Sequence, residues 1–153
     1  MDLRIREVTT ENWLSTALLS VEEDQKEFIE SNSFSLAQSM FEPEWHSISL
    51  YDEETIIGYA MYGGNILHEG IWLDRFMIDK HYQGKGYAKR FLPLVIEHIK
   101  SIYQCDTLYL SVSPENKAAQ ALYEKFGFYL NGEVDNSGIV AGLVMELIIS
   151  HRS

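Results

Sequence analysis

The chain of 153 residues has one cysteine, three prolines and no apolar run near the roughly 20 residues that a membrane-spanning helix requires. The lone thiol, Cys105, excludes a disulfide within the chain, and the first residues lack the apolar stretch of a signal peptide. The five histidines are scattered without metal-ligand spacing. We therefore expect a cytoplasmic protein with no membrane attachment and no metal site.

Basic residues are also scarce. The chain has 12 Lys and Arg against 23 Asp and Glu, so its net charge is 12 − 23 = −11. Residues 1–54 hold 13 acids and 3 bases, a net of −10, whereas residues 55–153 hold 10 acids and 9 bases, a net of −1. This excess opposes binding to nucleic acid or to an anionic membrane and favours cationic partners, unless it serves only solubility.

What is abundant is material for a core, since 46% of the residues are hydrophobic and 12% aromatic. The length and the absence of repeats or linkers predict a single α/β domain over residues 1–153 with a mixed sheet. Alternating or buried apolar runs predict strands at residues 4–8, 45–51, 55–62, 70–78, 108–112, 128–134 and 139–148. The last two are expected to form a hairpin across residues 135–138.

Helices are expected in four places. The first would begin with Thr10 as its N-cap and bury Leu14 and Leu18, and the second would span residues 25–40 with a break near residues 31–33. The third follows a glycine-containing loop and runs to Ile102. The fourth would start at residues 114–116 and end at Gly127.

The loop at residues 79–88 carries Gly84 and Gly86 between a buried strand and a helix. Backbone amides at such a helix start can converge on an anion such as a phosphate. A P-loop is excluded because no Ser or Thr follows Lys85, and a dinucleotide fingerprint is excluded because Lys89 occupies the third glycine position.

Two motifs carry a family resemblance. Gln83-x-x-Gly86-x-Ala88 resembles the Arg/Gln-x-x-Gly-x-Gly/Ala signature of the GNAT N-acetyltransferase superfamily. Asn116-x-x-Ala119-x-x-Leu122-Tyr123-x-x-x-Gly127-Phe128 resembles its later segment, and the resemblance covers nearly the full length. Within the superfamily, residues 72–79, 82–86 and 131–133 look most like bacterial diamine, spermidine and spermine acetyltransferases.

The resemblance implies a GNAT fold: a mostly antiparallel sheet of about six to seven strands, with a splayed central parallel pair and about four flanking helices. It also implies acetyl-CoA as co-substrate, with the thioester in the gap between the parallel strands. The residues that it assigns to acetyl-CoA are Phe76, Met77, Ile78, Gln83, Gly84, Lys85, Gly86, Tyr87, Ala88, Lys89, Asn116 and Tyr123. Three alternatives stay open: core packing for residues 76–78, a solvated basic face for Lys85, Lys89 and Arg90, and an ordinary N-cap for Asn116.

For catalysis, the resemblance assigns Tyr123 as the general acid, since a phenol is protonated at neutral pH and can protonate a thiolate. A ring packed between helix and sheet is the alternative. Asp74 is the candidate base, where related enzymes carry glutamate, and structural ion pairing is the alternative. Arg75 stands where eukaryotic relatives carry a second acid.

For the acceptor, Glu23, Glu27 and Glu30 would lie along one face if residues 21–30 are helical. Together with Asp74, Glu133 and Asp135 they are candidates for binding a polycation, with a solvated surface as the alternative. The resulting hypothesis is direct acetyl transfer from acetyl-CoA to spermidine or spermine in a ternary complex, by a homodimer as in most relatives. Another amine (an amino acid, an aminoglycoside or a protein N-terminus) and a non-catalytic acyl-CoA sensor are the alternatives.

Overall fold

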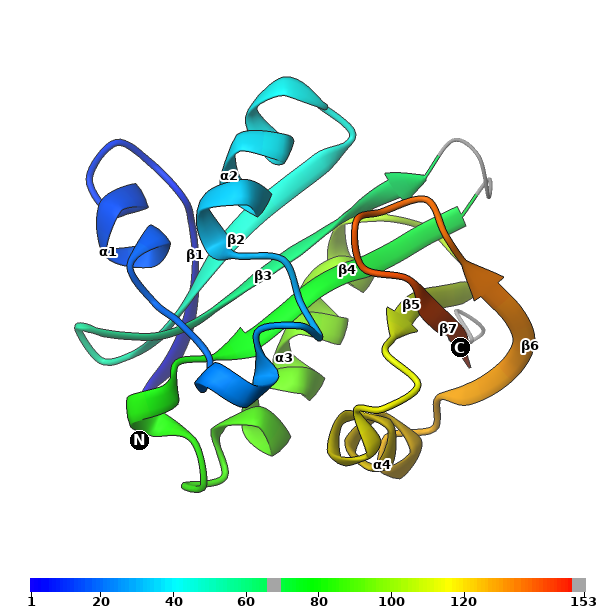
Figure 1. The fold of residues 1–153 in the computed structure, drawn as a ribbon. Coiled ribbons are helices and arrows are strands. Elements are labelled where there is room, and N and C mark those ends of the chain that lie inside the picture. Colours follow the sequence, from blue (N-terminus) through cyan, green and yellow to red (C-terminus); the bar gives the residue numbers. More distant parts are fainter. Residues whose placement is uncertain (66–69, 150–153) are drawn as a thin grey trace.

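The computed structural model describes residues 1–65 and 70–149. Its strands form one sheet in the order β1-β2-β3-β4-β5-β7-β6 (Figure 1). Their bounds are β1 Leu3–Glu7, β2 Trp45–Asp52, β3 Thr55–Asn65, β4 Gly70–Ile78, β5 Thr107–Val112, β6 Tyr129–Asp135 and β7 Gly142–Ile148. Only the pair β4 and β5 is parallel. The predicted mixed, mostly antiparallel sheet is confirmed.

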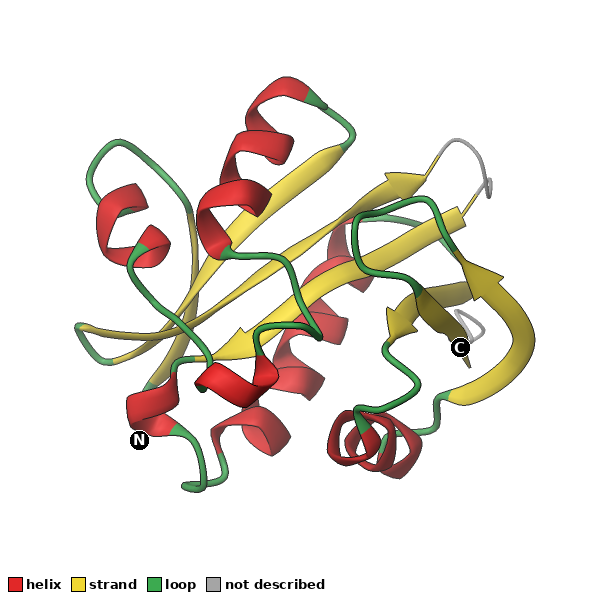
Figure 2. Ribbon diagram, viewed as in Figure 1, coloured by secondary structure: helices red, strands yellow, loops and turns green. Residues whose placement is uncertain are grey.

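Helices cover both faces of the sheet (Figure 2). Their bounds are α1 Trp13–Ala17, α2 Asn32–Phe41, α3 Tyr87–Ile102 and α4 Lys117–Lys125, with 3-10 turns at Glu23–Gln25 and Lys80–Tyr82. Helices α1 and α2 lie on one face, and α3 crosses the other. Because apolar residues recur every three to four positions in α3, it presents one continuous apolar stripe, and Phe91, Val95 and Ile99 on it are fully buried.

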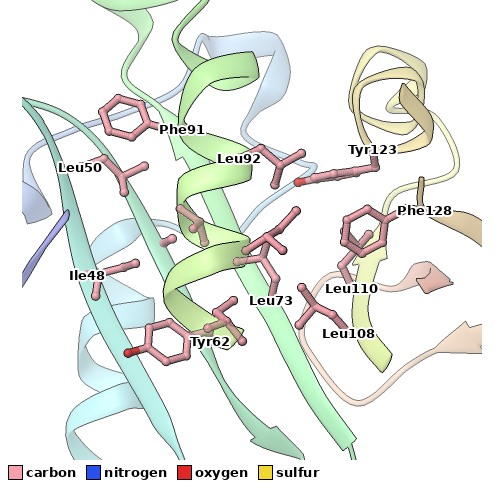
Figure 3. Packing of buried hydrophobic residues seen from close by; sticks show 14 of the residues in the cluster. Ile48, Leu50, Tyr62, Leu73, Phe91, Leu92, Leu108, Leu110, Tyr123 and Phe128 are labelled. Carbon is pink, nitrogen blue, oxygen red and sulfur yellow. The ribbon is translucent and has the colours of Figure 1, made fainter. Parts of the chain in front are cut away.

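The core has two parts, one on each face of the sheet. Alternation along the strands sends Ile48 and Leu50 of β2 toward α3, and Tyr59 and Met61 of β3 toward α1 and α2. The α3 side is the larger, and it extends to Tyr123 and Phe128 near α4 (Figure 3).

Two N-terminal predictions are wrong. The first helix begins at Trp13 with Asn12, not Thr10, at its N-cap position, and Leu14 and Leu18 are exposed. Residues 21–30 are not one helix, since only the 3-10 turn Glu23–Gln25 forms there. Tertiary hydrogen bonds hold this segment instead: the Ser20 amide donates to Asp79 Oδ1 at 2.8 Å, and Gln83 Nε2 donates to Gln25 Oε1 at 3.1 Å.

The last hairpin also differs from the prediction, because β7 starts at Gly142 and leaves residues 136–141 as a longer loop. The pairing of β6 with β7 shifts between Leu130 and Val134, so β6 carries extra residues there and its end is displaced relative to β7. The loop lies free of the ladder and can contact other parts of the molecule.

The centre of the sheet has two irregularities at neighbouring positions. Strands β4 and β5 pair only at Ile71 with Leu108 and at Trp72 with Tyr109, and then diverge (Figure 1). Directly after this, the register between β3 and β4 shifts: Tyr62 pairs with Leu73 and Met61 with Arg75. Asp74 is therefore an extra residue, a β-bulge in the middle of β4. The predicted splayed parallel pair is present.

Candidate active site

A cleft of about 1100 Å³ opens where β4 and β5 diverge. Its walls come from the segment before α2, from α2 itself, from the second half of β4, from the start of α3, from α4 and from residues 135–141. Two ends of this cleft differ in the groups that line them. The amide end comprises residues 84–89, and the acidic end comprises Glu30, Asp74, Arg75 and Asp135.

The amide end is built from main chain. Gly84 and Gly86 have φ angles of +78° and +85°, which glycine adopts without strain, and no heavy atom lies within 4 Å of a Cβ placed on either. Gly86 is the N-cap of α3. The backbone N–H groups of residues 84–89 donate to no acceptor within the described part of the chain. A row of free amides at a helix start in open space fits a diphosphate.

The side chains of the amide end hold the loop in place. The Gln83 amide donates to the Ile78 carbonyl at 3.0 Å, so this predicted ligand also fixes the loop against the end of β4. The Tyr87 hydroxyl donates to Asp52 Oδ2 at 2.6 Å, and this hydrogen bond lowers the pKa of Asp52. Lys89 lines the cleft, whereas Lys85 stacks over the Tyr82 ring and does not line it.

The middle of the cleft combines core and site. Phe76, Met77 and Ile78 all line it, and Met77 and Ile78 are also buried in the core. Asn116 lines the cleft and caps α4, since its Oδ1 accepts from the Ala119 amide at 3.2 Å. Both interpretations from the sequence are therefore compatible at each of these positions.

Tyr123, the candidate general acid, comes from α4. Its ring is buried and packs edge-on against Phe128, with ring centres 5.8 Å apart. Figure 3 shows the ring extending from α4 with the hydroxyl directed away from that helix. The residue lines the cleft, and its hydroxyl has no hydrogen-bond partner among the described residues. Burial raises the pKa of Tyr123, so the phenol keeps its proton throughout the neutral range.

The acidic end gathers charged groups from three segments: the one before α2, β4 and the end of β6. Asp74 pairs with Arg75, and Arg75 Nε lies 3.2 Å from Glu30 Oε1. Burial raises the pKa of the Asp74 carboxyl, Arg75 opposes this rise, and Glu30 and Asp135 add to it. Asp135 is buried, and its Oδ1 accepts from the amide and the hydroxyl of Ser137. A carboxylate with a raised pKa beside a cleft is suited to take up a proton.

Comparison with known proteins agrees with this geometry. The model of the Acetyltransferase (GNAT) family matches residues 7–128. The chain belongs to the GNAT acetyltransferase family. This membership confirms the predicted fold and enzyme class, and acetyl-CoA is the acetyl donor of GNAT acetyltransferases.

Several similar GNAT proteins are named as polyamine N-acetyltransferases. A probable spermine N(1)-acetyltransferase of Bacillus subtilis subsp. natto is 38% identical over 144 residues, which cover 90% of this chain and 95% of the relative. The spermine/spermidine N(1)-acetyltransferase of Bacillus subtilis strain 168 is 37% identical over 144 residues, which again cover 90% of this chain and 95% of the relative. Spermidine N-acetyltransferase from Vibrio cholerae, solved with CoA and spermine, superposes with a TM-score of 0.75 at 18% identity, over 96% of this chain and 95% of that one.

Three predicted acceptor residues lie outside the cleft of this GNAT domain. Glu23 is exposed and pairs with Lys26 at 2.9 Å, Glu27 is exposed on the same segment, and Glu133 is exposed on β6. Glu30, Asp74 and Asp135 are brought together. Their convergence depends on the irregular segment before α2 and on the β6–β7 loop, neither of which has a sequence period.

Sequence reasoning missed part of the wall. Phe34, Gln38 and Phe41 of α2 also line the cleft, although none of them is among the site residues expected from the sequence. No local motif marks them. None of the helices within residues 1–65 and 70–149 is long and apolar enough to cross a membrane, and no set of three or more His, Cys, Asp or Glu in those ranges could hold a metal ion.

Proposed function

We propose that this GNAT enzyme transfers the acetyl group of acetyl-CoA to an amine of a small polyamine, with spermidine and spermine as the first candidates. One observation carries the proposal: a single cleft is lined by a row of free backbone amides, by a group of three carboxylates and by Tyr123. The first end fits an anion and the second a cation. The two Bacillus relatives, which are named as spermine and spermidine acetyltransferases, support the same substrate class.

At the amide end, residues 84–88 would bind the diphosphate of acetyl-CoA through their N–H groups, with Lys89 adding positive charge. Acetyl-CoA supplies the acetyl group as an activated thioester. The second half of β4, which has no β5 partner after Trp72, offers main-chain groups along the path from the amide end to Tyr123. The chain therefore has a continuous route for an extended ligand.

At the acidic end, Glu30, Asp74 and Asp135 would attract and orient a protonated amine. A polyamine nitrogen must lose a proton before it can attack, and Asp74 is placed to accept it, directly or through water. Tyr123 can donate its proton to the departing sulfur. Cys105 does not line the cleft, which favours direct transfer between the two substrates over a covalent enzyme intermediate.

We further propose that the chain is a single catalytic domain that acts as a cytoplasmic homodimer. The edge strand β6 exposes Tyr129, Leu130 and Val134, and β7 exposes Ile148 beside it. An apolar edge strand of this kind favours pairing with a second copy. Sedimentation velocity on the purified protein would test the dimer.

The test of the function is release of free thiol from acetyl-CoA with a panel of amines. Spermidine and spermine should be turned over with higher kcat/KM than amino acids, an aminoglycoside or peptides with a free N-terminus. The variant Glu133→Gln should show the same preference among amines as the wild type, since Glu133 is exposed outside the cleft. Equal rates across the panel would reject the polyamine assignment, and acetyl-CoA binding without turnover on any amine would favour a sensor.

A further inference from the structure

Arg75 makes an unusual number of contacts for one buried side chain. Its side chain is 6% exposed, and all three guanidinium nitrogens have partners. Nε donates to Ser35 Oγ at 3.1 Å and lies 3.2 Å from Glu30 Oε1. Nη2 donates to Gln38 Oε1 at 2.9 Å, and Nη1 donates to the carboxylate and the carbonyl of Asp74. One group thus joins β4, the segment before α2 and two turns of α2.

The bulge in β4 is what allows this arrangement. In a regular strand, consecutive side chains point to opposite faces, so Asp74 and Arg75 could not both reach the cleft. Because Asp74 is the extra residue between Leu73 and Arg75, the alternation restarts after it. Leu73 belongs to the core on the α3 side, and both Asp74 and Arg75 line the cleft on the α2 side.

The charges at this end are unequal. Three carboxylates, those of Glu30, Asp74 and Asp135, line the acidic end, and Arg75 is its single cation within the described residues. The Tyr59 hydroxyl of β3 lies close enough to Arg75 and Asp74 for their charges to act on it. The Glu30 side chain is 9% exposed and that of Asp74 14%, so solvent gives them little screening. Without the guanidinium, these acids would repel one another across a space of low dielectric.

We propose that Arg75 is the positioning residue of the acidic end: its guanidinium keeps Asp74 as an ionised carboxylate beside the cleft, anchors the Glu30 side chain next to it, and fixes α2 against β4. The role that it supports, proton uptake by Asp74 from an amine, rests on the proposed function. Arg75 itself contacts neither substrate in this scheme. A planar fork suits the task, because it can bond several acceptors at once in fixed directions, which an ammonium group cannot.

The test is a titration of the Asp74 carboxyl by ¹³C NMR without substrate, assigned by loss of its signal in Asp74→Asn. In Arg75→Gln, the midpoint should rise by one pH unit or more. Arg75→Lys should restore part of the shift, since it returns the charge without the fork. Arg6→Gln is the matched control, because Arg6 also pairs with a carboxylate, Glu54, and stacks on Tyr51, but lies outside the cleft.

Loss of a buried cation can unfold a protein, because it leaves paired acids uncompensated. The double variant Glu30→Gln/Arg75→Gln removes one acid with the cation and keeps the net charge. Its Asp74 midpoint should still exceed that of the wild type, since the guanidinium hydrogen bonds are gone. If the Asp74 midpoint is the same as wild type in the folded variants, the proposal is wrong.

A kinetic measurement distinguishes a positioning role for Arg75 from a merely structural one. With an amine that the wild type accepts, Arg75→Gln should move the acidic limb of kcat/KM to higher pH and leave the KM for acetyl-CoA unchanged. A merely structural role would lower kcat/KM by a similar factor at every pH and would not move the acidic limb. The NMR titration needs no turnover, so a failure to acetylate polyamines would reject the proposed function and leave the Arg75 result standing.

Discussion

At one end of the cleft the groups are backbone amides from a single segment, residues 84–89, and at the other they are side chains from three separate segments. The amide end needs only two glycines with positive φ and a helix start, and all of this is local. The acidic end needs β4, the segment before α2 and the end of β6 to meet. The amide end should therefore tolerate changes elsewhere in the chain, whereas the acidic end depends on the tertiary structure.

The uneven distribution of charge along the sequence does not predict which acids line the cleft. Residues 1–54 carry 13 of the 23 acids, but only Glu30 and Glu42 of these line the cleft. Asp74 and Asp135 come from the nearly neutral part. The carboxylates that line the cleft are thus selected by the fold and not by the acidic excess of residues 1–54. Most of the N-terminal acids lie outside the cleft and can act only on solubility or on long-range attraction.

The largest expected effect is at Tyr123, the candidate general acid in the cleft. Tyr123→Phe should lower kcat about 100-fold or more, because a general acid contributes on the order of 10² to 10⁴. The Kd for acetyl-CoA should stay unchanged, since the ring and its packing on Phe128 remain. Thiol-release kinetics and calorimetric titration with acetyl-CoA would check this pair of results. Unchanged turnover would leave Tyr123 with a packing role only.

A smaller effect is expected at Asp74, and it should depend on pH. The carboxyl must be ionised to accept a proton, so wild-type kcat/KM should fall as the pH drops through the pKa of Asp74, which burial raises. Asp74→Asn should lose about tenfold or more near pH 7 and recover at high pH, where the amine loses its own proton. A pH profile parallel to that of the wild type would place the base elsewhere.

Gly86→Ala should disturb the amide end alone. An L-residue at φ +85° costs about 1–2 kcal/mol, which predicts a rise of about tenfold in the KM for acetyl-CoA. The KM for the amine should not change. Gly132→Ala is the matched control, because Gly132 has a φ of +90°, open space around its Cβ position and no place in the cleft. Equal changes in both variants would mean that the amides do not bind the donor.

Glu30→Gln should disturb the acidic end alone and most mildly. Loss of one paired carboxylate should raise the KM for a polyamine by about fivefold, equivalent to about 1 kcal/mol. The KM for acetyl-CoA should stay the same. Glu23→Gln is the control, since Glu23 is exposed outside the cleft, and initial rates at varied amine concentration give both values. If Glu23→Gln has the larger effect, the acceptor site has been placed wrongly.

Much of the fold follows from the sequence because its signals are local. The glycine loop, the apolar stripe of α3 and the alternation of β2 and β3 each specify their own structure, and the second motif marks α4. Residues 21–30 could not be predicted in the same way. The spacing of their acids suits a helix. Hydrogen bonds between Ser20 and Asp79 and between Gln83 and Gln25 hold the segment in another conformation.

The acidic end shows a second limit of sequence reasoning. Strict alternation along residues 70–78 would place Asp74 and Arg75 on opposite faces, and no residue in that stretch signals a bulge by its type. Arg75 looked like a departure from related enzymes, and its role becomes visible only with Glu30 and Gln38 in place. Contacts between segments far apart in the chain leave no period to detect.

The bulge at Asp74 has a consequence beyond the direction of one side chain. It follows directly after Trp72, the last residue of β4 that pairs with β5. A bulge bends its strand and increases its twist, so the extra residue that lets Asp74 and Arg75 share one face of the sheet also favours the divergence of β4 from β5. The paired Asp74 and Arg75 side chains and the opening of the cleft thus share one origin in the backbone. Regular pleating through residues 73–75 would send Asp74 and Arg75 to opposite faces and remove the bend at the cleft in a single step.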